Sequence, residues 1–217
     1  MSAVSYELFL PEVMPYVHDV PEIVAVQAIR NACIEFCEET HYLQEILDPI
    51  TGVEGIGLYQ LDANDSTNYK VVEIMQAYYG DQLLIPKSQE QLNQIYRTSN
   101  WENLKGNPYY YFRTRASEMR LVTMPIKTEA NKLSVKAALA PRRSSTTVDD
   151  ELFERFLEQI SFGARARLYN TPNQPYYDPK TAMEYTKRFN DVMAEVRTRV
   201  YKGLTRTAVN IEYQRFV

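Results

Sequence analysis

The sequence predicts an α+β fold: a helical bundle of one N-terminal and two C-terminal helices, with an inserted antiparallel β element and an extended C-terminal arm. Apolar residues recur every three to four positions near both ends of the chain, which is the period of a helix. They alternate in the middle and again in the last residues, which is the period of a strand. The expected divisions are 1–42 with 144–203 for the bundle, 43–143 for the β-rich insertion and 204–217 for the arm.

The first long helix is expected in the stretch HDVPEIVAVQAIRNACIEFCEET, after a short helix or turn over residues 6–16. Asp19 is the candidate N-cap, Glu22 three residues later completes a capping box, and Pro21 falls in the first turn. The helix should end near Thr40. Its apolar stripe is predicted to contain Ile23, Val26, Ile29, Cys33, Phe36 and Cys37.

The middle of the chain predicts several short strands with polar turns, and so a small antiparallel sheet or sandwich. A strand should reach a Gly80–Asp81 turn, and a second short strand should end at Pro86. Ser88 begins a short capped helix, and two strands should flank residues 116–118. A further strand places three apolar side chains on one face: Leu133, Val135 and Ala137.

Two helices are predicted near the C-terminus. Thr147 is the expected cap of the first, with Asp149 and Asp150 in its first turn, and the helix should end near Asn170. Its stripe contains Leu152, Phe156, Ile160, Gly163, Ala164 and Leu168. The second helix should start at Asp178–Pro179 and stop at Gly203. Its stripe contains Ala182, Tyr185, Phe189, Val192, Val196 and Val200, and its i,i+4 ion pairs are Glu184–Arg188 and Glu195–Arg199.

The last fourteen residues, LTRTAVNIEYQRFV, have the pattern of a strand rather than of a fraying tail. A lone strand leaves its backbone N–H and C=O groups unpaired, so this arm requires a partner. The side chains expected to anchor the arm to that partner are Val209, Ile211, Tyr213 and Phe216.

Charge is unevenly distributed along the chain. Residues 1–69 hold twelve acids and one base, whereas residues 70–141 and 142–217 have net charges of +4 and +3. This distribution favours either oriented stacking against a basic surface or an acidic wall, and the alternative is an acidic surface that aids solubility. The candidate acids for such a wall or stacking surface are Glu35, Glu38, Glu39 and Glu45. A pI near 5.4 argues against a protein that grips nucleic acid, and no apolar run approaches the ~20 residues of a membrane span.

Little in the sequence predicts catalysis, a metal or another cofactor, and we expect a protein that is not an enzyme. Cys33, Cys37 and His41 are spaced to share a helix face, which would be a metal site if a fourth ligand existed. Burial of two reduced cysteines in the core is the stronger interpretation. The acids at 149–151 resemble a metal cluster too, but a capped helix start explains them. Tyrosines 109–111 could stack bases, although such rings more often pack a sheet or an interface.

Two stretches resemble the head–tail connector (portal adaptor) proteins of tailed bacteriophages. The first contains Pro15-Tyr16-Val17, then Pro21, then Ile29 to Cys37. The second runs from a strand that ends at Pro141, through a helix that begins at 149–151, to a proline loop and the last helix. The loop carries Pro175, Tyr176 and Tyr177 before Asp178–Pro179. Together the stretches cover about half of the chain, and the segment 43–133 is similar only in being β-rich.

The resemblance implies a structural protein of the virion at the head–tail junction, made in the host cytoplasm. It implies a homo-oligomeric ring of twelve copies beneath the portal that extends the DNA channel and seats the tail. The implied partners are other copies, the portal protein, a tail or nozzle protein, and DNA that passes without specific binding, with no membrane. The alternatives are another tail component, such as a nozzle or tail-completion protein, and a small metal-binding protein.

Overall fold

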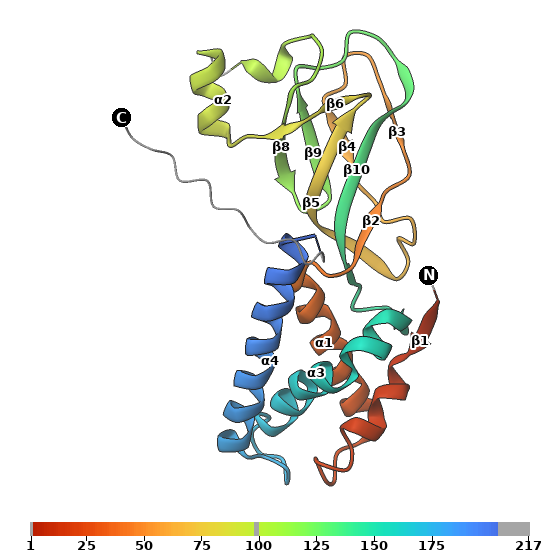
Figure 1. Ribbon diagram of the computed structural model, residues 1–217, viewed down its shortest axis with the longest axis vertical. Helices are drawn as coiled ribbons and strands as arrows, with labels where there is room; N and C mark the ends of the chain where they lie inside the picture. Colours follow the sequence, from red (N-terminus) through yellow and green to blue (C-terminus); the bar gives the residue numbers. More distant parts are fainter. Residues whose placement is uncertain (1, 98–99, 204–217) are drawn as a thin grey trace.

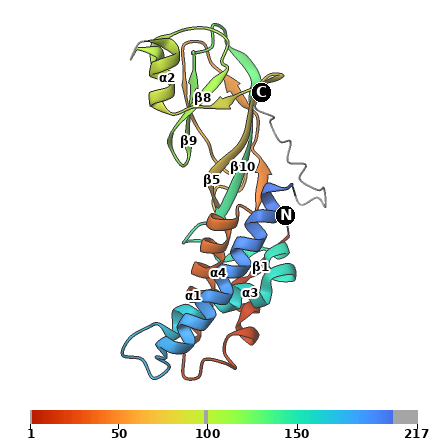
Figure 2. The ribbon, with the colours of Figure 1, turned by 60° about the vertical axis from the view of Figure 1, so that its left-hand side comes forward.

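The computed structural model describes residues 2–97 and 100–203. The molecule is elongated, with its long helices at one end and most of its strands at the other (Figure 1). The view in Figure 2, turned by 60°, shows the same division. The predicted α+β class is confirmed, because helices and largely antiparallel sheets occupy separate parts of the fold.

Three long helices pack against one another at the helical end: α1 (Glu22–Thr40), α3 (Asp150–Tyr169) and α4 (Pro179–Tyr201). They approach closely at Gly163 of α3. A Cβ atom added there would lie 2.9 Å from the Phe189 ring of α4 and 3.1 Å from Ala32 Cβ of α1. Gly163 therefore lets α3 contact both neighbouring helices at one point, and a larger side chain would force them apart.

Helix α1 begins later than the sequence predicted, and the expected capping box is wrong. Pro21 is the N-cap residue, with φ −60° and ψ 134°, and no side chain caps the helix. Asp19 lies outside it with a φ of +60°. Glu22 is consequently the first helical residue rather than the third, so the Asp19–Glu22 spacing no longer matches a capping box. The predicted end at Thr40 is confirmed.

The predicted stripe of α1 is wrong at Ile23, whose side chain is 78% exposed. The helix turns by about 100° per residue, which places Ile23 on the face opposite Ala25. Ala25 belongs to the face that packs against the other elements. The buried residues of that face are Ala25, Ala28, Ile29, Ala32, Cys33, Phe36 and Cys37.

Helix α3 also begins differently from the prediction, because Thr147 does not cap it. Residues Thr147–Asp149 form strand β11, which pairs antiparallel with β1 (Ala3–Ser5). The N-cap is Asp149, whose Oδ1 accepts the backbone N–H of Glu151 at 2.9 Å. Pairing with the distant N-terminus keeps residues 147–149 extended, which the local helix-start pattern could not indicate.

Helix α3 is irregular at Phe156, where φ is −129° and ψ is 19°. Phe156 was predicted in the buried stripe, and it is partly buried. Its ring centroid lies 4.8 Å from that of Phe36 on α1 and 4.8 Å from that of Tyr42. The other five residues of the predicted stripe are buried.

Helix α4 follows the predicted pattern at both ends. Asp178 Oδ1 accepts the backbone N–H groups of Lys180 at 3.1 Å and Thr181 at 3.2 Å, with Pro179 as the first helical residue. At the other end Gly203 has a φ of +72°, and its N–H donates to Val200 O at 2.9 Å. The two predicted i,i+4 ion pairs are present: Glu184–Arg188 and Glu195–Arg199.

The N-terminal 3-10 helix η1 (Tyr6–Glu12) is held to this helical end by Arg165 of α3. Arg165 is 3% exposed, and its Nε donates to Glu12 O at 2.9 Å. The guanidinium lies 3.6 Å from the centre of the Tyr16 ring, which is a close cation–π contact. One buried arginine therefore connects the start of the chain to its C-terminal third.

The larger sheet has the order β2–β10–β5–β6, and β3 pairs with the far part of β10. Its strands are β2 (Gln44–Ile46), β3 (Ile50–Gly52), β5 (Tyr69–Tyr79), β6 (Gln82–Leu83) and β10 (Glu129–Pro141), all antiparallel to their neighbours. The predicted Gly80–Asp81 turn joins β5 to β6. Leu133, Val135 and Ala137 are buried as predicted. Ala138 and Ala140 are buried as well, in the part of β10 nearest the helices.

The smaller sheet has the order β4–β9–β8–β7. Its strands are β4 (Leu58–Gln60), β7 (Ile85–Pro86), β8 (Tyr110–Arg115) and β9 (Glu118–Val122), and the β7–β8 pair is parallel. The predicted helix after Ser88 is α2 (Gln89–Tyr96), which has a capping box with Gln91. With η2 (Trp101–Asn103), α2 buries Leu92 and Trp101 against this sheet. The two sheets share the main hydrophobic core, as in a sandwich.

Candidate assembly surfaces

The four acids chosen from the sequence lie where the helical end meets the β end. Glu35, Glu38 and Glu39 are on the last part of α1, and Glu45 is on β2. Helix α1 contacts β10 here, and β2 pairs with the middle of the same strand. The structure therefore places these acids in one region, at the junction of α1 with the larger sheet.

Three of these carboxylates form ion pairs with bases from later in the chain. Lys70 Nζ of β5 lies 2.6 Å from Glu38 Oε1, and Arg197 Nη1 of α4 lies 3.8 Å from Glu39 Oε2. Arg167 of α3 pairs with Glu35. Glu45 is partly buried and has no ion pair within residues 2–97 and 100–203. Among the described residues, Glu45 is thus the candidate acid whose charge is not offset by an ion pair.

The charge imbalance along the sequence is partly compensated by folding. The ion pairs that join the acidic first third to later residues are Glu12–Arg165, Glu35–Arg167, Glu38–Lys70, Glu39–Arg197 and Glu54–Lys105. A net charge counted over a stretch of sequence is therefore not the charge of one face of the protein. Exposed pairs of this kind each contribute only about 0–1 kcal/mol to stability.

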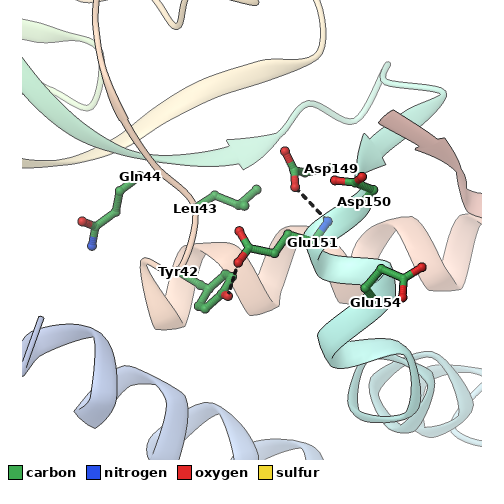
Figure 3. A pocket seen from close by; sticks show the side chains of 7 residues that line it. All are labelled: Tyr42, Leu43, Gln44, Asp149, Asp150, Glu151 and Glu154. Carbon is green, nitrogen blue, oxygen red and sulfur yellow. Dashed lines mark hydrogen bonds between the residues drawn. The ribbon is translucent and has the colours of Figure 1, made fainter. Parts of the chain in front are cut away.

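An acidic pocket of about 610 Å³ lies beside these residues, between the segment after α1 and the start of α3. Figure 3 shows Tyr42, Leu43 and Gln44 on one side of it and the acids on the other. The acids are Asp149, Asp150, Glu151 and Glu154. From the sequence, the acids at 149–151 were predicted to mark a capped helix start rather than a metal cluster. The sequence does not indicate the pocket, because residues 42–44 and 149–154 are distant in the chain and are brought together by folding.

Two hydrogen bonds organise the pocket. Tyr42 Oη donates to Glu151 Oε1 at 2.9 Å, and Asp149 caps α3 (Figure 3). Burial, together with the hydrogen bond to Glu151, raises the pKa of Tyr42 to about 12. Burial also raises the pKa of the Asp149 carboxyl. Across residues 2–97 and 100–203, no group of three or more His, Cys, Asp or Glu side chains is arranged to hold a metal ion.

The residues considered for a metal site from the sequence do not meet on one helix face. Cys33 and Cys37 are free thiols buried among the core residues of α1. Burial raises the pKa of both thiols well above the ordinary range, which disfavours the thiolate that a metal would bind. His41 ends α1 with a left-handed φ of 53°, and its ring faces Tyr201 at 6.4 Å.

The other predicted binding residues, Val209, Ile211, Tyr213 and Phe216, lie outside the described residues. The described chain reaches Gly203 at the end of α4. That end lies beside the end of α1, because the Tyr201 and His41 rings are in contact. The described chain therefore ends near the junction of the helical and β ends.

None of the helices described is long and apolar enough to cross a membrane.

Comparison with known proteins identifies one family. The model of the family described as SU10 adaptor protein matches residues 3–210, which include both ends of the molecule and the first part of the arm. No curated protein matches the sequence at the significance required. The family match confirms the resemblance to phage head–tail adaptors, and it extends to the β-rich middle, where the sequence motifs were weakest.

Proposed function

We propose, on the premise that the chain belongs to the SU10 adaptor protein family of bacteriophage structural proteins, that it joins the head of the virion to the tail as a ring beneath the portal. In this position the ring, with twelve copies expected, extends the DNA channel and provides the seat for the tail. The observation that carries the proposal is the family match over residues 3–210.

The arm is the proposed attachment to the portal or to the neighbouring subunit. Residues 204–217, if extended, would span about 46 Å at ~3.3 Å per residue, which is enough to reach beyond one subunit. Ordering them costs about 1–2 kcal/mol of backbone entropy per residue. Added main-chain hydrogen bonds, with Val209, Ile211, Tyr213 and Phe216 as anchors, would offset this cost on assembly.

DNA is proposed to pass through the ring without being bound specifically. An acidic wall repels phosphates and keeps DNA mobile, whereas each added Lys or Arg would attract them. Three of the four candidate acids are paired within the chain, so Glu45 is the acid whose charge supports this role best. The same position on β2 also suits a seam between copies.

The test is a mass measurement on the purified protein, alone and after mixing with its portal protein. Twelve copies of the 25.3 kDa chain would add about 300 kDa to the portal. A ring that forms with the portal, and then binds the tail protein, supports the proposal. A chain that ignores the portal and binds only a finished tail would contradict it and would indicate a nozzle or tail-completion protein instead.

A further inference from the structure

The β end has two opposite edges that each expose large apolar side chains. The first, the β6–β7 edge, consists of Tyr78, Leu83 and Ile85, which are 36%, 46% and 47% exposed. The second, the β2–β4 edge, consists of Ile46, Ile56, Leu58 and Ile126, which are 64%, 46%, 43% and 54% exposed. Strands β6 and β7 end one side of the two sheets, whereas β2 and β4 end the other.

The β6–β7 edge follows one short stretch of chain that passes from the larger sheet to the smaller one. Leu83 is the strand partner of Tyr78, and Ile85 is the strand partner of Tyr110. Leu84, between the two exposed side chains, is 2% exposed and points into the core. Leu83 and Ile85 therefore point away from the core on adjacent strands of the two sheets.

The β2–β4 edge is built in the same way on the opposite side. Ile46 precedes buried Leu47, and Leu58 precedes buried Tyr59, so each exposed side chain alternates with a core residue. The loops that carry Ile56 and Ile126 are joined by a hydrogen bond from Gly55 N to Pro125 O at 3.0 Å. In Figure 1, β2 and β3 lie at the right of the β end, and α2, which follows β7, lies at the left.

The two edges lie at nearly the same height along the strands. In the larger sheet, Leu83 pairs with Tyr78, which in turn pairs with Ser134 of β10. Ile46 pairs with Lys136 of the same strand, two residues along from Ser134. In the smaller sheet, Ile85 pairs with Tyr110, which in turn pairs with Val122 of β9. Leu58 pairs with Arg120 of the same strand, again two residues along. Each offset is about 7 Å.

The two offsets also have the same direction. Position 136 of β10 is closer to the helices than position 134. In the smaller sheet, Arg113 lies beside Met119 and pairs with Glu73 of β5, so position 120 is likewise closer to the helices than position 122. Because the two edges differ in height by the same amount in both sheets, a modest tilt of each copy brings the edges of neighbouring copies to one height. Successive copies are then not displaced along the ring axis.

A contact between two unlike surfaces of identical chains closes into a ring only when there is no such displacement, and otherwise continues as a helix. Opposite charges also lie beside the two edges, together with Asp81 before β6 and Lys136, the strand partner of Ile46. Lys87 follows β7, whereas Glu45 and Asp48 flank Ile46, and none of these three is in an ion pair within the described ranges 2–97 and 100–203. A second copy of this chain is therefore the partner that fits each edge.

We propose that the β6–β7 edge of one copy packs against the β2–β4 edge of the next, so that contacts between β ends close the ring. This inference rests on the proposed ring and names the surfaces that form it. The edge strands have only two or three residues each, so apolar side chains, rather than a long run of backbone hydrogen bonds, carry the contact. The predicted seam acid Glu45 lies at its margin.

The first experiment changes one edge at a time. Leu83→Asp/Ile85→Asp places charge on the β6–β7 edge, and Ile46→Asp/Leu58→Asp places it on the β2–β4 edge. Ile23→Asp is the matched control, because Ile23 is an exposed apolar residue on α1, outside both edges. With portal present, we expect each edge variant to lose the ring, while the wild type and Ile23→Asp retain it. Urea unfolding of each variant establishes that the chain still folds.

The second experiment tests the head-to-tail orientation. Chains with Leu83→Cys are mixed with chains with Ile46→Cys under oxidising conditions, since the native Cys33 and Cys37 are buried. The mixture should give a covalent dimer about tenfold more abundant than in either chain alone. A chain with both substitutions should give a ladder of linked copies. A self-complementary contact would instead cross-link the Leu83→Cys chain with itself.

The outcomes separate this inference from the proposed function. A wild-type ring on the portal that persists in both edge variants overturns the seam and leaves the adaptor role intact. Edge variants that keep the ring but lose the tail protein also overturn it, because the edge then binds the tail. A wild type that forms no ring with the portal overturns both. Loss of the ring in each edge variant, with cross-linking in the mixture, supports the inference.

Discussion

Lys70 Nζ lies 2.6 Å from Glu38 Oε1, and this ion pair joins strand β5 to helix α1 at the junction of the two ends of the molecule. Arg142 reinforces the β10–β5 pair close by, because its Nε donates to Tyr69 O at 3.0 Å. Since β10 also packs against α1, the helical and β ends are connected by side-chain contacts as well as by the chain itself. Force on one end can therefore be passed to the other, as the proposed position between head and tail requires.

Removal of residues 204–217 should leave the fold intact and abolish stable docking to the portal. The helix stop at Gly203 precedes the arm, and the main core of the described residues is formed by elements that come before this stop. The truncated chain should therefore keep its circular dichroism spectrum and unfolding midpoint. If it still co-purified with the portal at the yield of the full chain, the arm would not be the attachment.

Loss of Arg165 should destabilise the chain, because Arg165→Ala leaves the Glu12 carbonyl without its donor and removes the contact with the Tyr16 ring. We expect about 1–3 kcal/mol less free energy of unfolding in urea. The matched control is Arg188→Ala. Arg188 lies over the Phe162 and Tyr185 rings as Arg165 does, but its side chain is exposed. Its replacement should therefore lower the free energy of unfolding by no more than about 0.5 kcal/mol. Equal losses in both variants would refute the special role of Arg165.

The approach of the three helices at Gly163 predicts a specific coupling. Gly163→Ala should destabilise the chain by about 1–3 kcal/mol through overpacking against Phe189, although alanine normally favours a helix. In a Phe189→Leu background the same change should cost less or nothing. Phe189→Ala alone should cost about 3–5 kcal/mol, and Phe156→Ala less, because Phe156 is only partly buried. Additive losses in the double variant would exclude the contact.

Local features of the fold were predictable from the sequence where the signal and its partner lie within a few residues. The Asp178–Pro179 start, the Gly203 stop and the Ser88 cap are of this kind, and all are present. The start of α3 was misassigned because β11 pairs with the distant β1. The acidic pocket and the two apolar edges also depend on long-range packing: alternation predicts which side chains share a strand face, but not which strand ends a sheet.

The raised pKa of Tyr42 predicts a loss of stability at alkaline pH. An unfolded tyrosine ionises near pH 10.0, whereas folded Tyr42 does so at about 12. Stability from its neutral form is therefore complete below pH 10 and falls as the pH rises towards 12. At pH 8 the free energy of unfolding of the wild type should exceed that of Tyr42→Phe by about 1 kcal/mol, because only the wild type has the hydrogen bond to Glu151. This difference should shrink above pH 10. A difference that stays constant with pH would contradict this.

The acids near the end of α1 give the last prediction, which concerns assembled particles. Changing Glu38, Glu39 and Glu45 together to Lys should impair genome passage or tail attachment while the isolated protein still folds. Glu38 and Glu39 are paired with Lys70 and Arg197 in partly exposed positions, so losing both pairs should cost about 1–2 kcal/mol at most.

Glu45→Lys alone is the sharper form of this test, because among the described residues Glu45 has no ion pair to lose. A lysine there would attract DNA phosphates if Glu45 faces the channel. It would repel Lys87 of the next copy if Glu45 borders the seam. The first case delays DNA ejection from intact particles, and the second reduces ring yield on the portal. The control is Glu158→Lys, an exposed acid of α3 outside the first third of the chain. Particles with Glu45→Lys that assemble, eject DNA and carry tails as the control does would show that Glu45 faces only solvent.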